Sequence, residues 1–172
     1  MQVHPSEWVY NRSVFEYTAF VKQIIWRYKY KGQENLAKPL GWLMAETLEQ
    51  HWGRKKFLLS YVPLHAQRLR ERGFNQAKQL ATEMGRYLRL PVVDLLVRKR
   101  MTHRQSEKRR SERLSSLIGA FSLKPDVKGD QLASAPILLV DDVYTTGATL
   151  RECSRPFKEQ GIQNVYSITI AR

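Results

Sequence analysis

Cysteine is nearly absent from this sequence, since Cys153 is the only one among 172 residues. A single thiol cannot form an intramolecular disulfide or build a cysteine cluster for zinc, and we expect it to be a packing residue of a helix. The sequence has no run approaching eighteen apolar residues and no apolar N-terminal signal segment. It therefore predicts a cytoplasmic protein without membrane insertion.

Motifs of several enzyme classes are also missing. The sequence contains no H-E-x-x-H, no C-x-x-C and no recognisable serine–histidine–acid arrangement, so hydrolytic and zinc chemistry have no support. It also lacks G-x-x-x-x-G-K-[ST] and G-x-G-x-x-G, the common phosphate-binding loops of nucleotide-binding proteins.

Acidic residues are few compared with basic ones. The chain has 16 Asp and Glu against 29 Lys and Arg, which gives a formal net charge of +13. Such an excess favours a polyanionic partner, either nucleic acid or a multiply phosphorylated substrate, although a generally basic surface is the simpler alternative. The length and a hydrophobic fraction of 42% predict one domain with a real core and a small attached extension.

The most informative stretch is ILLVDDVYTTGATL, residues 137–150. Its first four residues are apolar without alternation, which predicts a strand buried on both faces of a parallel sheet. Asp141 and Asp142 follow at the carboxyl end, the edge where open α/β sheets bind ligands. They are followed by a stretch of small residues that predicts a phosphate-binding loop at the start of a helix over 147–160. The residues of this stretch are Thr145, Thr146, Gly147, Ala148 and Thr149.

Two carboxylates would repel a phosphate, so they suit ribose hydroxyls or a Mg²⁺ ion with its waters. The expected ligand is a phosphorylated sugar held at both ends. The whole stretch resembles the phosphoribosyl-diphosphate (PRPP) motif of type I phosphoribosyltransferases. The resemblance implies that Asp141 and Asp142, the candidate catalytic residues, hold the ribose hydroxyls, that the small-residue loop binds the 5′-phosphate, and that Mg²⁺ accompanies PRPP near the acids without direct protein ligands. A buried strand followed by an ordinary turn is the alternative.

A second candidate anion site follows the first predicted sheet strand, residues 57–63. The next segment is a basic loop leading to a helix over 74–89, and arginine suits a diphosphate through its rigid donor fork. In phosphoribosyltransferases the loop after the first strand binds pyrophosphate. This resemblance makes four residues candidates for that role: Leu64, His65, Arg68 and Arg72. For His65 a structural role is equally open.

Three further motifs resemble the ComF/ComFC competence family, proteins of phosphoribosyltransferase fold needed for DNA uptake in natural transformation. They are V-P-L-x-x-x-R-L-x-x-R-G-F-N-Q from Val62, Y-K-Y-K-G from Tyr28, and a downstream set of Gln105, Arg110 and Gly119-Ala120-Phe121. Family members commonly carry a four-cysteine zinc ribbon, which this sequence lacks, so no zinc expectation follows. The resemblance implies competence proteins as partners.

The predicted fold is α/β and type I phosphoribosyltransferase-like, with a mostly parallel five-stranded sheet flanked by helices. Helical spacing predicts helices over 14–30 and 36–52, which form an N-terminal extension of residues 1–52 on a domain of residues 53–172. Residues 92–97 and 164–171 are predicted strands. Pro156 is expected to kink or shorten the helix after the phosphate loop.

The segment 98–113 has eight cations against two glutamates, a local net charge of +6. The family fold places a flexible hood over the active site there. Such a loop could close on pyrophosphate, bind a DNA backbone, or simply be a solvated loop. The candidates for the hood or for single-stranded DNA are Arg100, Arg104, Gln105, Lys108, Arg109 and Arg110.

Two function classes follow from the sequence. The protein is either an enzyme that transfers phosphoribosyl from PRPP to an unidentified acceptor, or a competence factor that binds single-stranded DNA and keeps the PRPP site as a sensor or relic. We favour a PRPP-binding competence protein and leave catalysis open, because phosphoribosyl transfer needs no protein nucleophile whose presence could prove it.

Overall fold

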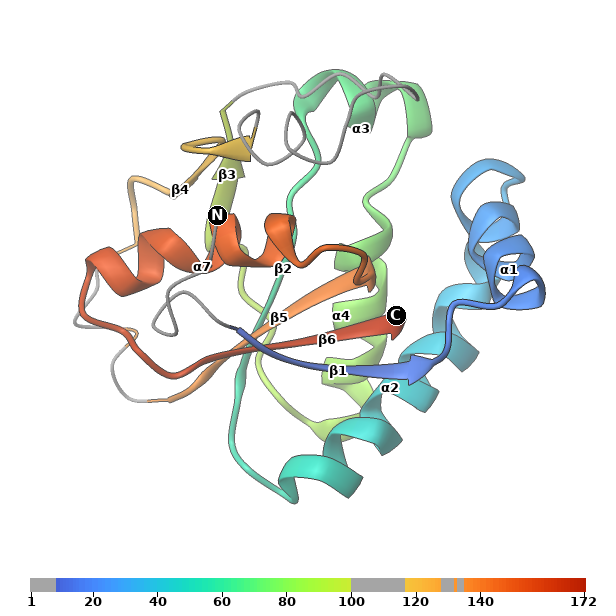
Figure 1. Cartoon of the computed structure of the whole chain (residues 1–172), viewed down its shortest axis with the longest axis horizontal. Helices are drawn as coiled ribbons and strands as arrows, with labels where there is room; N and C mark the ends of the chain where they lie inside the picture. The colour runs from blue at the N-terminus through green and yellow to red at the C-terminus, as the bar shows by residue number, and fades with distance from the viewer. Residues whose placement is uncertain (1–8, 100–116, 128–131, 133–134) are drawn as a thin grey trace.

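The computed structural model describes residues 9–99, 117–127, 132 and 135–172. Its centre is a four-stranded sheet in the order β1-β6-β5-β2, and each neighbouring pair of strands is parallel (Figure 1). The strands are β1 (Tyr10–Phe15), β6 (Val165–Ala171), β5 (Ile137–Val143) and β2 (Leu58–Tyr61). The predicted α/β class with a mostly parallel sheet is confirmed.

Helices cover both faces of this sheet. The chain forms α1 (Ala19–Tyr30), a short 3-10 helix (Glu34–Leu36), α2 (Ala37–Trp52), α3 (Ala66–Arg72), α4 (Gln76–Leu88) and α7 (Ala148–Glu159). Side chains of α1, α2 and α4 form one apolar core, and side chains of α7 belong to the other. None of the described helices is long and apolar enough to cross a bilayer.

The position of β5 between the two apolar cores explains why its first four residues are apolar without alternation. Leu138 and Val140 belong to the core with α2 and α4, whereas Ile137 and Leu139 belong to the core with α7. All four are fully buried. Because side chains of a strand alternate between the faces, burial on both faces requires an apolar residue at every position.

Residues 92–97 do not form the predicted second strand of the main sheet. Among the described residues this sheet has four strands, whereas five are predicted. Val92 makes only an isolated parallel bridge to Leu59. The chain then leaves the sheet, and β3 (Leu96–Arg98) pairs antiparallel with β4 (Phe121–Leu123) in a separate two-stranded sheet. The apolar residues Leu95, Leu96 and Phe121 are buried there against the α7 core, which satisfies the same hydrophobic pattern without extending the sheet.

The predicted helix over 14–30 begins too early. Residues Tyr10–Phe15 form an edge strand whose backbone pairs with β6, and α1 starts only at Ala19, where the Thr18 side chain accepts a hydrogen bond from the Val21 N–H (3.3 Å). The predicted second helix agrees with α2. One apolar core includes residues from both sides of the predicted boundary at residue 52; the division into two domains stays a prediction.

Two smaller expectations can also be compared with the structure. The helix after the predicted phosphate loop is not shortened, since α7 continues through Pro156 to Glu159, and the alternative expectation of a kink at Pro156 stays a prediction. The basic segment after β2 is not an open loop, because residues 66–72 form α3, which ends at Gly73 with a φ of 83°. At this position a glycine permits the left-handed conformation that stops the helix.

Candidate functional site

Asp141 and Asp142 lie in the last three residues of β5, at the carboxyl edge of the parallel sheet. They are 8% and 5% exposed, which is unusual for carboxylates unless other groups compensate their charge. The backbone N–H of Asp142 donates to Asp141 Oδ1 at 2.8 Å. The pair is therefore held rigidly beside the loop that leads into α7.

Lys29 of α1 forms an ion pair with Asp142 Oδ2. Its side chain is 15% exposed, so the contact is largely screened from water. The sequence motif Y-K-Y-K-G does not indicate that Lys29 pairs with an acid. No local signal links residues 113 positions apart, so only the packing of α1 beside the end of β5 reveals this partner.

Burial raises the pKa of Asp141 to about 6, although the nearby cations Lys29, Arg98 and Arg72 oppose the shift. Burial likewise lowers the pKa of the Arg98 guanidinium, while Asp141 raises it. Strongly perturbed groups of this kind are common at functional sites. Arg98 of β3 is therefore a further candidate site residue, which the sequence analysis did not single out.

Three described segments bring cations to the acid pair. Lys29 comes from α1, Arg72 from α3 and Arg98 from β3, and the charge of Arg68 in turn acts on Arg98. Arg72 donates to the Tyr30 hydroxyl at 3.2 Å and to Gln76 Oε1, which fixes its guanidinium. This ring of cations suits the diphosphate end of a ligand.

Of the other predicted pyrophosphate residues, His65 caps α3. Its Nδ1 accepts a hydrogen bond from the Gln67 N–H at 3.3 Å. This contact corresponds to the structural role, one of the two roles that the sequence left open for His65. Leu64 precedes it at the end of the β2 connection. The hood candidates between Arg100 and Arg110 lie outside the described residues.

The small-residue loop lies directly after β5. Gly147 has a φ of 71° and precedes the first residue of α7, Ala148. A Cβ at Gly147 would lie 2.4 Å from the Tyr144 hydroxyl, and the positive φ would strain the backbone of any residue with a side chain there. The Ala148 N–H donates to Thr146 Oγ1 at 3.4 Å, and the first intrahelical bond runs from Arg151 N to Gly147 O. Neighbouring N–H groups of this first turn have no partner within the helix.

Metal ligands are scarce at this site. Within the described part of the chain, no three His, Cys, Asp or Glu residues gather closely enough to hold a metal ion. The two acids of β5 do not suffice, because Asp142 already pairs with Lys29. These side chains do not fit a metal ion that is held by the protein. They fit only an ion that is coordinated mainly by a bound phosphorylated compound and by water.

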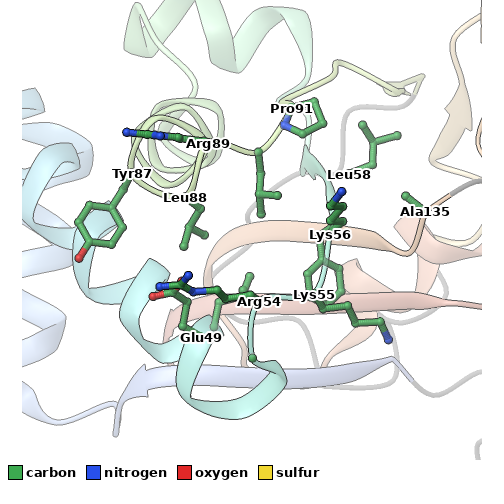
Figure 2. Close-up of a pocket in the computed structure, with 14 residues that line it drawn as sticks. Glu49, Arg54, Lys55, Lys56, Leu58, Tyr87, Leu88, Arg89, Pro91 and Ala135 are labelled. Carbon is green, nitrogen blue, oxygen red and sulfur yellow. The ribbon is translucent and has the colours of Figure 1, made fainter.

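A pocket of about 820 Å³ lies elsewhere, at the amino ends of the strands beside Leu58 and Ala135 (Figure 2). It does not include the acid pair. We base the candidate site on the buried charges and the helix N-terminus, since a phosphate binds at such a place without a deep cavity.

A comparison with protein-family models finds no match. The chain is 34% identical to the competence protein ComFC of Bacillus subtilis (strain 168) over 163 residues, which cover 94% of this chain and 64% of that relative. It is 32% identical to the competence protein ComFC of Streptococcus pneumoniae (strain ATCC BAA-255 / R6), covering 95% of this chain and 69% of the relative. It is 31% identical to competence protein F of Haemophilus influenzae, covering 87% and 66%.

The chain therefore spans about two thirds of the length of these relatives, and slightly less for the first. The similarity extends over nearly all of this chain in the first two comparisons. On this identity and coverage, the chain belongs to the ComFC family of competence proteins.

Proposed function

We propose that this protein has a type I phosphoribosyltransferase-like fold, binds PRPP at the carboxyl edge of its sheet and acts in DNA uptake. The observation that supports PRPP binding most directly is the buried pair Asp141 and Asp142 next to a glycine-containing loop at the start of α7. The role in DNA uptake rests on the relatives, which are named as competence proteins.

Each part of PRPP has a chemically suitable partner in this arrangement. The 5′-phosphate binds the N–H groups and hydroxyls of residues 145–149, where the helix dipole favours an anion. The ribose hydroxyls donate to Asp141 and Asp142. The diphosphate binds the cations Arg72 and Arg98, and Lys29 joins it when the ligand takes over the contact with Asp142. Mg²⁺ bound to the diphosphate would supply further positive charge there.

Transfer would break the bond between the ribose C1 and a diphosphate oxygen and form a bond from C1 to the acceptor. Arg72 and Arg98 would stabilise the charge that develops on the leaving diphosphate. The alternative is a non-catalytic, single-stranded-DNA-binding competence factor in which the same site only senses PRPP. Release of pyrophosphate, screened over bases and nucleic acids as acceptors, distinguishes the two.

Calorimetric titration with PRPP and Mg²⁺ tests the binding site. A Gly147→Val substitution is unsuitable, because a side chain there would strain the backbone and meet Tyr144. The variant Thr145→Val/Thr149→Val instead removes two hydroxyls with little change in shape. Each hydroxyl bound to a charged phosphate contributes about 1.5–3 kcal/mol, so we expect PRPP affinity to fall by at least roughly tenfold per contact.

Thr82→Val is the matched control. The Thr82 hydroxyl bonds to the Lys78 carbonyl on α4 (2.9 Å), remote from the loop, so this variant should bind PRPP like the unaltered protein. Unchanged PRPP affinity in the folded double variant, or equal losses in both variants, would contradict the assignment of the 5′-phosphate to this loop.

A further inference from the structure

The amino edge of the sheet, opposite the acid pair, contains the open pocket of about 820 Å³ (Figure 2). The last turn of α2, the segment 53–58, the end of α4 and residues 89–91 form its walls. Its apolar lining includes Leu48, Phe57, Leu58, Leu88, Leu90 and Pro91. A large hollow with apolar walls at the protein surface favours a ligand that has an apolar part.

The rim of this pocket is strongly basic. Glu49 is the one acid among the lining residues. The four exposed cations that line the pocket are Arg54, Lys55, Lys56 and Arg89. Arg54 Nε lies 3.9 Å from Glu49 Oε1, a long contact on a side chain that is 94% exposed, so it compensates little charge. Lys56 and Arg89 have no ion pair with a described acid. The ligand should therefore be an anion.

Exposed aromatic rings flank this basic rim. Lys55 Nζ lies 3.2 Å from the Tyr166 hydroxyl and 4.6 Å from the centroid of its ring. The Tyr166 ring in turn lies 6.3 Å from that of Tyr10, which is 74% exposed. On the other side, the half-exposed Tyr87 lines the pocket and packs edge-on against Trp42, with ring centroids 6.5 Å apart.

We propose that this surface binds single-stranded nucleic acid, at a site separate from the PRPP site. Cations along a groove neutralise the phosphates, and exposed rings stack on the bases, whose faces a duplex would hide. The apolar pocket between the two aromatic groups accepts an unstacked base. The proposal gives the alternative function named above a binding surface of its own. It does not depend on PRPP binding, because none of the lining residues belongs to the acid pair, its cations or the α7 loop.

The competing surface is helix α1, which has exposed aromatic residues of its own, Phe20 and Trp26 among them, with Lys31 Nζ 5.0 Å from the Trp26 ring. The amino edge is favoured because its cations surround a pocket, whereas no residue of α1 lines it. Helix α1 therefore supplies the matched control for charge.

The test measures binding of a labelled oligodeoxythymidylate of roughly 16 nucleotides by fluorescence anisotropy over a range of salt concentrations. The test variant is Arg54→Gln/Lys55→Gln/Lys56→Gln, in which all three altered side chains are exposed. Each lost contact with a phosphate should flatten the slope of log K against log salt by roughly 0.7, which is about fivefold in affinity at 0.1 M salt. Three contacts predict a loss of roughly 100-fold.

The control variant Lys22→Gln/Arg27→Gln/Lys31→Gln removes three exposed charges from α1 and its C-cap and should bind the oligonucleotide almost normally. A separate Tyr10→Ala variant should lose roughly tenfold in affinity with little change of the salt slope, because it removes stacking and not charge. Titration of the test variant with PRPP should give the affinity of the unaltered protein, whether that affinity is high or undetectable.

Three results would overturn the proposal: no binding of the oligonucleotide by the unaltered protein, unchanged affinity in the test variant, or equal losses in the test and control variants. The last result would assign the binding to net charge alone. Circular dichroism and thermal unfolding of each variant verify that a loss of binding is not a loss of fold.

Discussion

Replacing Asp141 by asparagine should stabilise the folded protein at neutral pH. Burial raises the pKa of this carboxyl from 3.8 to about 6 on folding, even though Lys29, Arg98 and Arg72 favour its ionised form. The folded state therefore holds the charged form at a cost. Asparagine removes the charge and retains an oxygen that can accept the hydrogen bond from the Asp142 N–H.

The size of the effect follows from linkage. A raised carboxyl pKa lowers stability in full above the folded pKa, and this penalty disappears as pH falls toward the unfolded value. The shift from 3.8 to about 6 corresponds to roughly 3 kcal/mol at pH 8 and to about 1 kcal/mol at pH 4.5. For a protein of this size, 3 kcal/mol raises Tm by roughly 6–12 °C.

The assay is thermal and denaturant unfolding of the unaltered protein and of Asp141→Asn between pH 4.5 and 8. Asp94→Asn is a suitable control, because Asp94 is a half-exposed acid paired with Lys124 at 2.6 Å and should change stability by less than about 1 kcal/mol. If Asp141→Asn is destabilising at pH 8, or if its effect is the same at both ends of the pH range, the reasoning about the buried charge is wrong.

Three further predictions concern other parts of the chain. Lys29→Met should destabilise the protein by about 2–3 kcal/mol in denaturant unfolding, because it leaves the buried Asp142 without its ion-pair partner; an unchanged midpoint would refute the pairing. Gly41→Ala should cost about 1–2 kcal/mol, since the new Cβ would lie 2.6 Å from Glu83 Cβ and must push α2 from α4; a more stable variant would contradict this packing. For the basic segment 98–113, the test variant neutralises Arg104, Lys108, Arg109 and Arg110. If this segment binds single-stranded DNA, the variant should flatten the slope of log K against log salt by roughly 0.7 per lost contact. If the segment is instead a hood over the active site, the variant should lose PRPP affinity.

The sequence alone determined those parts of the structure in which local pattern and burial agree. The apolar run of β5 predicted a strand buried on both faces, and the two acids after it predicted a ligand edge. Helix α4 was equally predictable, because its helical pattern begins after Asn75, whose side chain accepts hydrogen bonds from the Ala77 and Lys78 N–H groups. In both cases the information lies within about fifteen neighbouring residues.

The first strand shows where this local reasoning failed. Residues 14–30 have apolar positions close to helical spacing, yet Val14 and Phe15 belong to β1. The backbone of this edge strand is satisfied by β6, which lies about 155 residues further along the chain and offers a free edge to pair with. Tertiary pairing of this kind overrides a weak local preference.

The surroundings of the two candidate sites were decided by the tertiary structure. Lys29 meets Asp142, and the charges of Arg72 and Arg98 act on Asp141, because the fold brings these side chains of α1, α3 and β3 within electrostatic range of the end of β5. The basic pocket likewise joins the ends of α2 and α4 with the start of β2. The sequence indicated the acids and the predicted phosphate loop through short-range pattern, but it could not specify which cations face them, because electrostatic partners are chosen by distance in space and not by distance along the chain.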